Sequence, residues 1–197
     1  MTSATPPRWA ETLLHLVLKS RDRATVSGDL LEEFREGIRP TRGPWGADGW
    51  YIRQVMGFVV RSNVLPALLF GGAFVTRTAL DWLQPPADFT TRSLISTLVA
   101  TSILLVSGFF ASWRSGRILA GCLSGIATTA LAALLSTIGV LGLLAIWHDP
   151  TTLQAIEGSG GLGEVLALPV MLIVPGVFLG TIGGVAGTLV HWGVGRS

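Results

Sequence analysis

Residues 118–147 read ILAGCLSGIATTALAALLSTIGVLGLLAIW, a stretch without a single charged side chain. A bilayer core of about 30 Å requires roughly 20 helical residues to cross it. The stretch exceeds that length, so it can span a membrane as one helix with some tilt or overhang. It therefore predicts that the chain is an integral membrane protein.

The composition agrees with a membrane environment. Hydrophobic residues make up 49% of the 197 positions, and charged residues only 13%. A soluble domain has about 25% charged residues. Because so few charges cannot cover a water-facing surface, lipid is expected to be part of the solvent of this protein.

Three further apolar segments lie before and after residues 118–147. The fold predicted is an all-α membrane protein with four transmembrane helices and a short cytoplasmic N-terminal helical prefix. The predicted spans cover about 55–83, 94–113, 118–147 and 165–192. Pro169 and Pro175 are expected to bend the first half of the last span, since proline cannot donate to the helical ladder.

The first span has charged residues near both ends of its apolar part. Only uncharged residues separate Arg61 from Arg77, and the interval is short. Both guanidinium groups are therefore expected to reach toward the lipid headgroups. Asp81 follows Arg77 by four positions, a spacing that places the two side chains on one helix face and predicts an ion pair.

Residues 1–54 are predicted to form the prefix and its linker, and residues 55–197 the transmembrane domain. A short amphipathic helix is expected after Pro7, and a second from about Thr25 to Ile38. Residues 39–49 (RPTRGPWGADG) are rich in proline and glycine and are predicted to be the linker. The two short helices would be marginal alone, so we expect them to pack on each other or on the membrane surface.

The distribution of basic residues predicts the orientation. Nine of the 14 basic residues lie within the first 61 positions, and Arg114, Arg117 and Arg196 follow segments that return to the same side. Basic residues accumulate on the cytoplasmic side of membrane proteins. Both termini are therefore predicted to be cytoplasmic.

Glycines recur at helical spacing within the last two spans. Close backbone approach at small residues is a main route to tight helix packing in lipid. We interpret these glycines as helix-packing positions, through which the third and fourth spans contact each other or a partner chain, with scattered membrane glycine as the alternative. The positions are Gly121, Gly125, Gly176, Gly180, Gly183, Gly184 and Gly187.

No residue pattern indicates catalysis. The chain lacks a nucleophile elbow and a phosphate-binding loop, and Cys122 is its only cysteine. His15, His148 and His191 lie in three separate regions. The prediction is a protein that is not an enzyme, with no cofactor, no metal site, no nucleic-acid partner and no identifiable small-molecule substrate.

Three short motifs in the first quarter of the chain resemble a known family. They are Pro6-Pro7-Arg8, the sequence GDLLEEF over residues 28–34, and WYIRQ over residues 50–54. In order and spacing they are similar to the permease prefix domain, which precedes MacB/FtsX-like ABC transporter permeases in bacteria and also occurs on small membrane proteins. The resemblance implies a cytoplasmic helical prefix attached to a membrane body, in a setting of export permeases of the bacterial inner membrane. A MacB-like permease would be several times longer, with a large external domain, so transport activity does not carry over.

The sequence leaves two functions open. The first is an accessory or structural subunit that contacts other membrane proteins, with an ABC-type permease as the leading candidate. Its partner contact would involve the acidic side chains of the second prefix helix, which could also be merely solvated: Asp29, Glu32, Glu33 and Glu36. The alternative is a small channel or transporter formed when the chain associates with itself, with a pore lined by serine and threonine hydroxyls.

Overall fold

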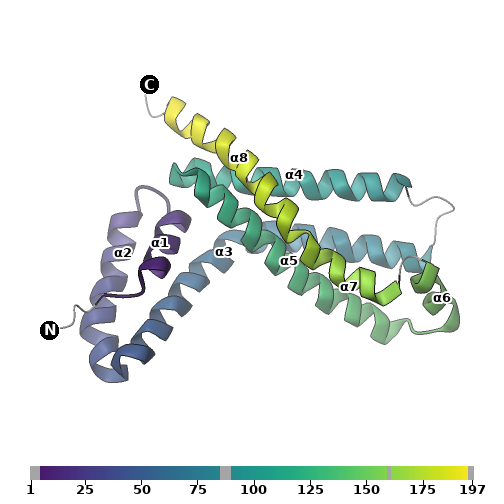
Figure 1. Cartoon of the computed structure of the whole chain (residues 1–197), viewed down its shortest axis with the longest axis horizontal. Coiled ribbons are helices and arrows are strands. Elements are labelled where there is room, and N and C mark those ends of the chain that lie inside the picture. Colours follow the sequence, from purple (N-terminus) through teal and green to yellow (C-terminus); the bar gives the residue numbers. More distant parts are fainter. Residues whose placement is uncertain (1–4, 85–89, 159–160, 195–197) are drawn as a thin grey trace.

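The computed structural model describes residues 5–84, 90–158 and 161–194, with the backbone alone at residues 155, 162, 164–166 and 168. Within these ranges the regular structure is helical and includes no strand (Figure 1). The elements in chain order are α1 (Arg8–Val17), α2 (Arg23–Glu32), the π-helix η1 (Glu33–Ile38), α3 (Arg39–Leu83), α4 (Thr90–Ser115), α5 (Ile118–Ile146), α6 (Pro150–Gly158), α7 (Gly161–Met171) and α8 (Ile173–Val194).

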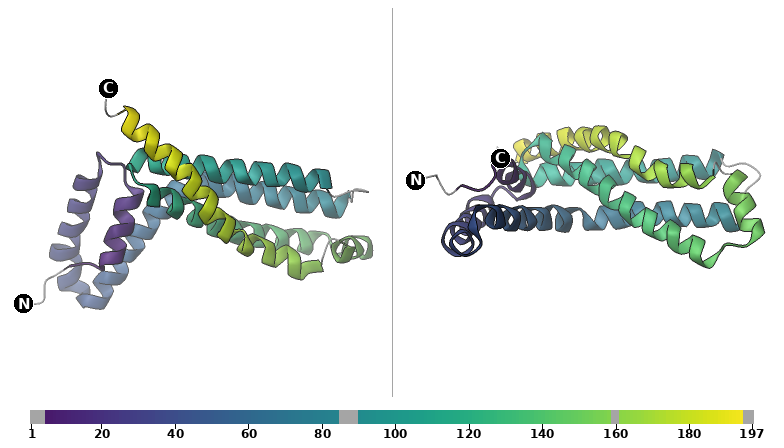
Figure 2. Two further views of the ribbon diagram at one scale, coloured as in Figure 1. Left: turned by 45° about the horizontal axis from the view of Figure 1, so that its top comes forward. Right: turned by 60° about the horizontal axis from the view of Figure 1, so that its bottom comes forward.

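The prediction of a multi-pass helical membrane protein is confirmed. Four helical stretches are long and apolar enough to cross a bilayer. They lie within Arg23–Leu83, Thr90–Ser115, Ile118–Ile146 and Pro169–Val194. The second half of α3, α4, α5 and α8 form an elongated bundle, whose outer surface carries large exposed apolar side chains such as Leu65, Ile138 and Phe178 (Figures 1 and 2).

The predicted linker over residues 39–49 is wrong, because this stretch is helical. Helix α3 begins at Arg39 and reaches Leu83, with one non-helical residue, Gly43 (φ 69°, ψ 179°), at a kink. Pro44 directly follows the kink and so lies in the first turn of the resumed helix. Proline is tolerated there, since the first N–H groups of a helix have no intrahelical partner. The helix is therefore interrupted at Gly43 and starts again at Pro44 in a new direction, with no loop between the two parts.

The end of the chain also differs from the prediction. The predicted loop before the last span contains helix α6, and the predicted span 165–192 is divided into α7 and α8 on either side of Leu172. Pro175 lies in the first turn of α8. Pro175 has no N–H to donate to the carbonyl of Met171, and its ring crowds that carbonyl, so the regular helix breaks at Leu172 and α8 begins after it.

The N-terminal helices pack on one another around their own apolar core. Leu14 of α1 and Phe34 of η1 are fully buried, as is Val55 of α3. The Phe34 ring meets the Tyr51 ring edge to face, with centroids 5.7 Å apart. The first part of α3 thus belongs both to this small core and to the helix that continues into the bundle.

The N-terminal helices and the end of α8 meet the bundle at the same end (Figure 2). The Ser20 N–H donates to the Arg114 carbonyl (3.3 Å), and the Arg23 guanidinium donates to the Ser115 carbonyl (3.1 Å). From the other side, His191 Nδ1 hydrogen-bonds the Trp113 carbonyl at 2.7 Å. The last turn of α4 therefore contacts both the N-terminal helices and α8.

Candidate functional site

A cluster of uncharged polar side chains lies inside the bundle where α3, α4 and α5 meet. It consists of Asn63, Ser107, Ser124 and Thr128, all buried. Asn63 Nδ2 donates to the Val59 carbonyl at 2.8 Å, which fixes the orientation of its amide. The amide oxygen Oδ1 therefore faces α5.

The hydrogen bonds of this cluster form a chain across three helices. Ser124 Oγ donates to Asn63 Oδ1 at 2.6 Å. Because the Ser124 proton is used in that bond, Ser107 donates to Ser124 across 2.7 Å. Thr128 lies 3.2 Å from Ser107 and 3.4 Å from Asn63 Oδ1. Each hydroxyl is thus satisfied inside the bundle, as buried polar groups require.

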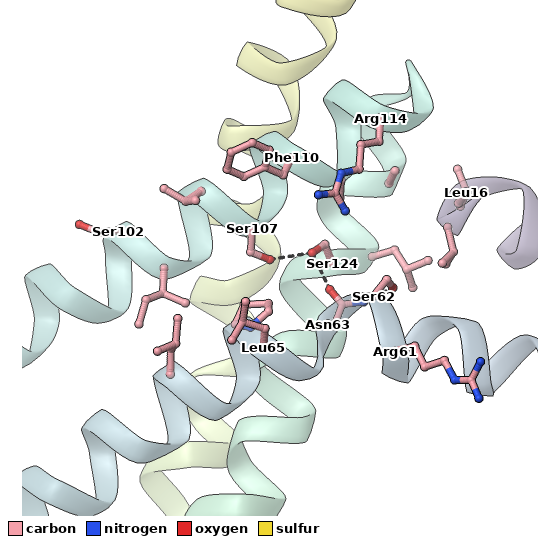
Figure 3. A pocket seen from close by; sticks show the side chains of 18 residues that line it. Leu16, Arg61, Ser62, Asn63, Leu65, Ser102, Ser107, Phe110, Arg114 and Ser124 are labelled. Atoms are coloured by element: carbon pink, nitrogen blue, oxygen red, sulfur yellow. Dashed lines mark hydrogen bonds between the residues drawn. The ribbon is translucent and has the colours of Figure 1, made fainter. Parts of the chain in front are cut away.

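A groove opens beside this cluster, between α3 and α4 (Figure 3). It encloses about 650 Å³ and is mainly apolar. Helix α5 contributes to its lining through Ala120, Leu123 and Ser124, and α1 contributes Leu16 and Val17 at one end.

Two arginines lie toward the α1 end of the groove, Arg61 on α3 and Arg114 on α4 (Figure 3). The Arg114 guanidinium carbon is 5.9 Å from the centroid of the Phe110 ring, within cation–π range. Among the described residues, neither arginine forms an ion pair with a carboxylate. The groove therefore combines an apolar body, hydroxyl and amide groups on its inner side and two uncompensated positive charges at one end.

A charged cluster holds the opposite end of the same two helices. Asp81 accepts from Arg77 of its own helix at 3.3 Å and from Arg92 of α4 at 3.1 Å. Arg77 also donates to Ser96 of α4 at 3.2 Å. The predicted Arg77–Asp81 pair is confirmed, and its extension to α4 was missed because sequence spacing gives no sign of the second helix.

The structure places all seven predicted packing glycines on helix contacts inside the chain. Gly121 and Gly125 of α5 face Gly176, Gly180 and Gly184 of α8. A methyl group at Gly180 would lie 2.6 Å from the Gly121 carbonyl oxygen. On another face of α8, added methyl groups at Gly183 and Gly187 would collide with backbone carbonyls of α4, those of Leu105 and Phe109. Since neighbouring helices of the same chain occupy these faces, they are closed to a partner chain.

The four predicted contact acids point into solvent. Asp29 and Glu32 on α2, and Glu33 and Glu36 on η1, are all exposed. The same helical run anchors itself through Leu30 and Phe34, which are buried in the N-terminal core. The structure thus holds the carboxylates outward and apart from the groove.

The histidines do not converge. His191 joins α8 to the last turn of α4, whereas Nε2 of His15 is buried without a hydrogen-bond partner. In the part of the chain that the structure describes, no three His, Cys, Asp or Glu side chains are grouped to hold a metal ion.

Asn63 is the site residue that sequence reasoning missed, although a signal was present. It is a strongly polar residue in an otherwise apolar run, directly after Arg61 and Ser62. Such a residue in a membrane helix is expected to find a polar partner on another helix. Ser124 and Thr128, four positions apart on α5, are the partners that this reasoning would have sought.

Comparison of the chain with protein-family models, with curated proteins and with solved structures found no match.

Proposed function

We propose that the protein is a non-enzymatic accessory or structural subunit of the bacterial inner membrane that contacts another membrane protein through its N-terminal helices. The exposed acidic face of α2 and η1 carries this proposal. Asp29 and Glu33 are four residues apart, as are Glu32 and Glu36, so like charges lie close together on the exposed side of the helical run. Like charges at this spacing weaken a helix, and a basic partner surface would relieve the repulsion.

The identity of the partner surface follows from its charge. Anionic lipid headgroups repel exposed carboxylates, so the face suits a basic protein surface rather than the bilayer itself. A permease of the ABC type is the candidate partner that the resemblance of the N-terminal motifs suggests. The glycine faces, occupied within the chain, are not part of this proposed contact.

The way the N-terminal helices are attached supports a coupling role. Helix α3 runs from their core into the bundle, and Ser20 and Arg23 donate hydrogen bonds to carbonyl groups in the last turn of α4. Two separate attachments restrict rotation of the acidic face relative to the bundle. Docking of a partner would therefore act on the membrane helices directly.

In the proposed orientation the N-terminal helices lie on the cytoplasmic side of the membrane. The end of the bundle that contacts the N-terminal helices also carries Arg61, Arg114 and Arg117. The positive-inside bias assigns such an end to the cytoplasmic side.

The test is crosslinking in native membranes, extraction in mild detergent and identification of co-purified proteins by mass spectrometry. The double variant Glu33→Lys/Glu36→Lys should lose a stoichiometric membrane partner that the wild type retains. Glu157→Lys, an exposed charge reversal on α6 at the other end of the bundle, should retain it. Recovery of the chain only with itself, as a defined oligomer, would contradict the proposal and favour the alternative of a small oligomeric channel.

A further inference from the structure

We propose that the groove between α3 and α4 binds one phospholipid with an anionic headgroup, whose phosphate lies beside Arg114, while Arg61 adds positive charge at the same end of the groove. This inference is independent of the partner contact proposed above. It rests on the position of the two arginines, on the direction in which the groove opens and on the order of chemical groups along it.

The arginines sit at the level where a headgroup is expected. Arg114 is in the last turn of α4, whose carbonyl groups also accept hydrogen bonds from the N-terminal helices. Arg61 lies on α3 at the same end of the groove, with its side chain directed away from Arg114 (Figure 3). Arginine donors in a planar fork suit phosphate oxygens, and neither group is neutralised by a carboxylate among the described residues. The charge of this end is therefore complementary to an anionic phosphate.

The groove opens sideways onto the apolar surface of the bundle. Leu65, Leu69 and Val106 line it and are each more than half exposed. At the α1 end, Leu16 and Val17 close it toward the N-terminal helices. A molecule that enters from the bilayer meets no barrier, whereas a water-soluble ligand would have to leave water for apolar walls. This geometry favours a lipid over free phosphate.

The chemistry along the groove follows the order of groups in a phospholipid. The Arg114 guanidinium comes first, Ser124 and Asn63 lie next, and apolar side chains follow toward Ser102. From Arg114 to Ser102 the helix rises about 18 Å, enough for a phosphate, a glycerol unit and the first part of an acyl chain. The volume of about 650 Å³ is within the usual range of ligand pockets.

The wall on the α5 side is fixed, which a binding site requires. Ser107, Ser124 and Thr128 satisfy one another and Asn63, so this polar side does not depend on the ligand for its hydrogen bonds. At the far end, the Asp81–Arg92 pair ties α3 to α4. The groove therefore lies between two sets of polar contacts, the hydrogen bonds of Asn63 at one end and the Asp81–Arg92 ion pair at the other.

The test is native mass spectrometry of the full chain in detergent micelles with phosphatidylglycerol or phosphatidylcholine added, together with its unfolding midpoint. Wild type should bind one phosphatidylglycerol in preference to phosphatidylcholine. Arg61→Gln/Arg114→Gln should bind phosphatidylglycerol about thirtyfold more weakly, taking the usual contribution of each basic residue near an anionic lipid. Arg61→Lys/Arg114→Lys keeps the charge and should retain most of the affinity, which separates loss of binding from loss of folding.

Two controls distinguish this site from general electrostatics. Arg53→Gln/Arg117→Gln removes two exposed charges outside the groove lining and should change affinity less than about threefold. Val106→Trp should fill the groove and reduce lipid binding in a folded protein. Equal loss in both double Gln variants, or no preference for phosphatidylglycerol, would overturn the proposal.

The remaining outcomes assign the groove to another occupant. Stabilisation of the wild type by inorganic phosphate alone, as large as that by phosphatidylglycerol, would identify a free anion and contradict the lipid. Conversion of a dimer into a monomer by Val106→Trp would assign the groove to a second copy of the chain and contradict it as well.

Discussion

Helix α8 and helix α3 are held against the rest of the bundle in different ways. Helix α8 packs glycine to backbone against both α4 and α5, with no room for a methyl group at Gly180 or Gly183. Helix α3 contacts α4 far less: the Arg92–Asp81 pair joins the two directly at one end of the groove, and at the other end Asn63 is linked to Ser107 of α4 through Ser124 of α5. In lipid, where helices gain little from the hydrophobic effect on meeting, close backbone contact and hydrogen bonds are the available means of association. Close backbone contact leaves no space between α8 and its neighbours, whereas the few side-chain contacts between α3 and α4 leave a groove.

The largest effect is expected from a bulky residue on the glycine side. Gly180→Leu would drive a side chain into the backbone of Gly121 and Gly125, so α5 and α8 must separate. We expect a loss of at least about 3 kcal/mol of stability, or failure to fold. Thermal unfolding monitored by fluorescence-detected size exclusion measures it. Gly72→Leu is the matched control, since a side chain there meets open space and should be tolerated.

A smaller loss of stability is expected when the ion pair between Asp81 of α3 and Arg92 of α4 is removed. Asp81→Asn leaves Arg77 and Arg92 close together without their shared carboxylate, and we expect about 2 kcal/mol of destabilisation. The unfolding midpoint in detergent is the measurement. Asp22→Asn breaks the exposed Arg21–Asp22 pair and should have almost no effect. Equal midpoints for the two variants would show that the charged cluster does not hold α3.

The hydrogen bonds of Asn63 should contribute less to stability than the ion pairs of Asp81 do. Asn63→Leu removes the acceptor of Ser124 and Thr128, and hydrogen bonds between membrane helices average about 0.6 kcal/mol each. We therefore expect about 1 kcal/mol of destabilisation, measured by unfolding of the purified protein. Ser102→Ala, an exposed hydroxyl at the other end of the groove, serves as the control and should not change stability. A stabilised Asn63→Leu would mean that apolar packing, not the polar cluster, joins α3 to α5.

The smallest effect is expected outside this comparison, at the start of α6. Asp149 accepts hydrogen bonds from the N–H groups of Thr151 and Thr152 and from their hydroxyls, and these bonds hold its pKa below its usual range. Asp149→Ala should loosen α6 and speed hydrogen exchange over residues 150–158, whereas Asp149→Asn should retain the cap.

The sign of the pH dependence follows from the lowered pKa. Because the folded carboxyl titrates below the unfolded one, its contribution is complete above about pH 4 and is lost as the pH falls further. Exchange over α6 should therefore not respond, through this group, to a change from pH 8 to pH 5. A cap-dependent change within that window would contradict the assignment.

The sequence predicted the span count because uncharged stretches of sufficient length admit few other structures. It could not predict that residues 39–49 are helical, since Gly43 and Pro44 act as a kink within α3 rather than as a loop. Spacing along one chain also cannot show which helices meet. Gly176 and Gly183 are both in glycine series, yet only the structure shows that one faces α5 and the other α4.

The groove was beyond sequence reasoning for a related reason. Arg61 and Arg114 are 53 positions apart, and each alone is typical of a helix end near a membrane surface. Only the placement of α3 beside α4, fixed through Asn63, Ser124 and Ser107, brings the two residues to the same end of the groove. The lone Asn63 was the one visible sign that such a meeting point exists.

One measurement tests the contrast between the two sides most directly: the unfolding midpoints of Gly183→Ala and Val106→Trp in the same detergent. A methyl group at Gly183 collides with the backbone of α4, whereas an indole at position 106 enters an open groove. The prediction is that the single methyl lowers the midpoint more than the whole indole does. A Gly183→Ala midpoint equal to that of the wild type, with Val106→Trp strongly destabilised, would contradict the account.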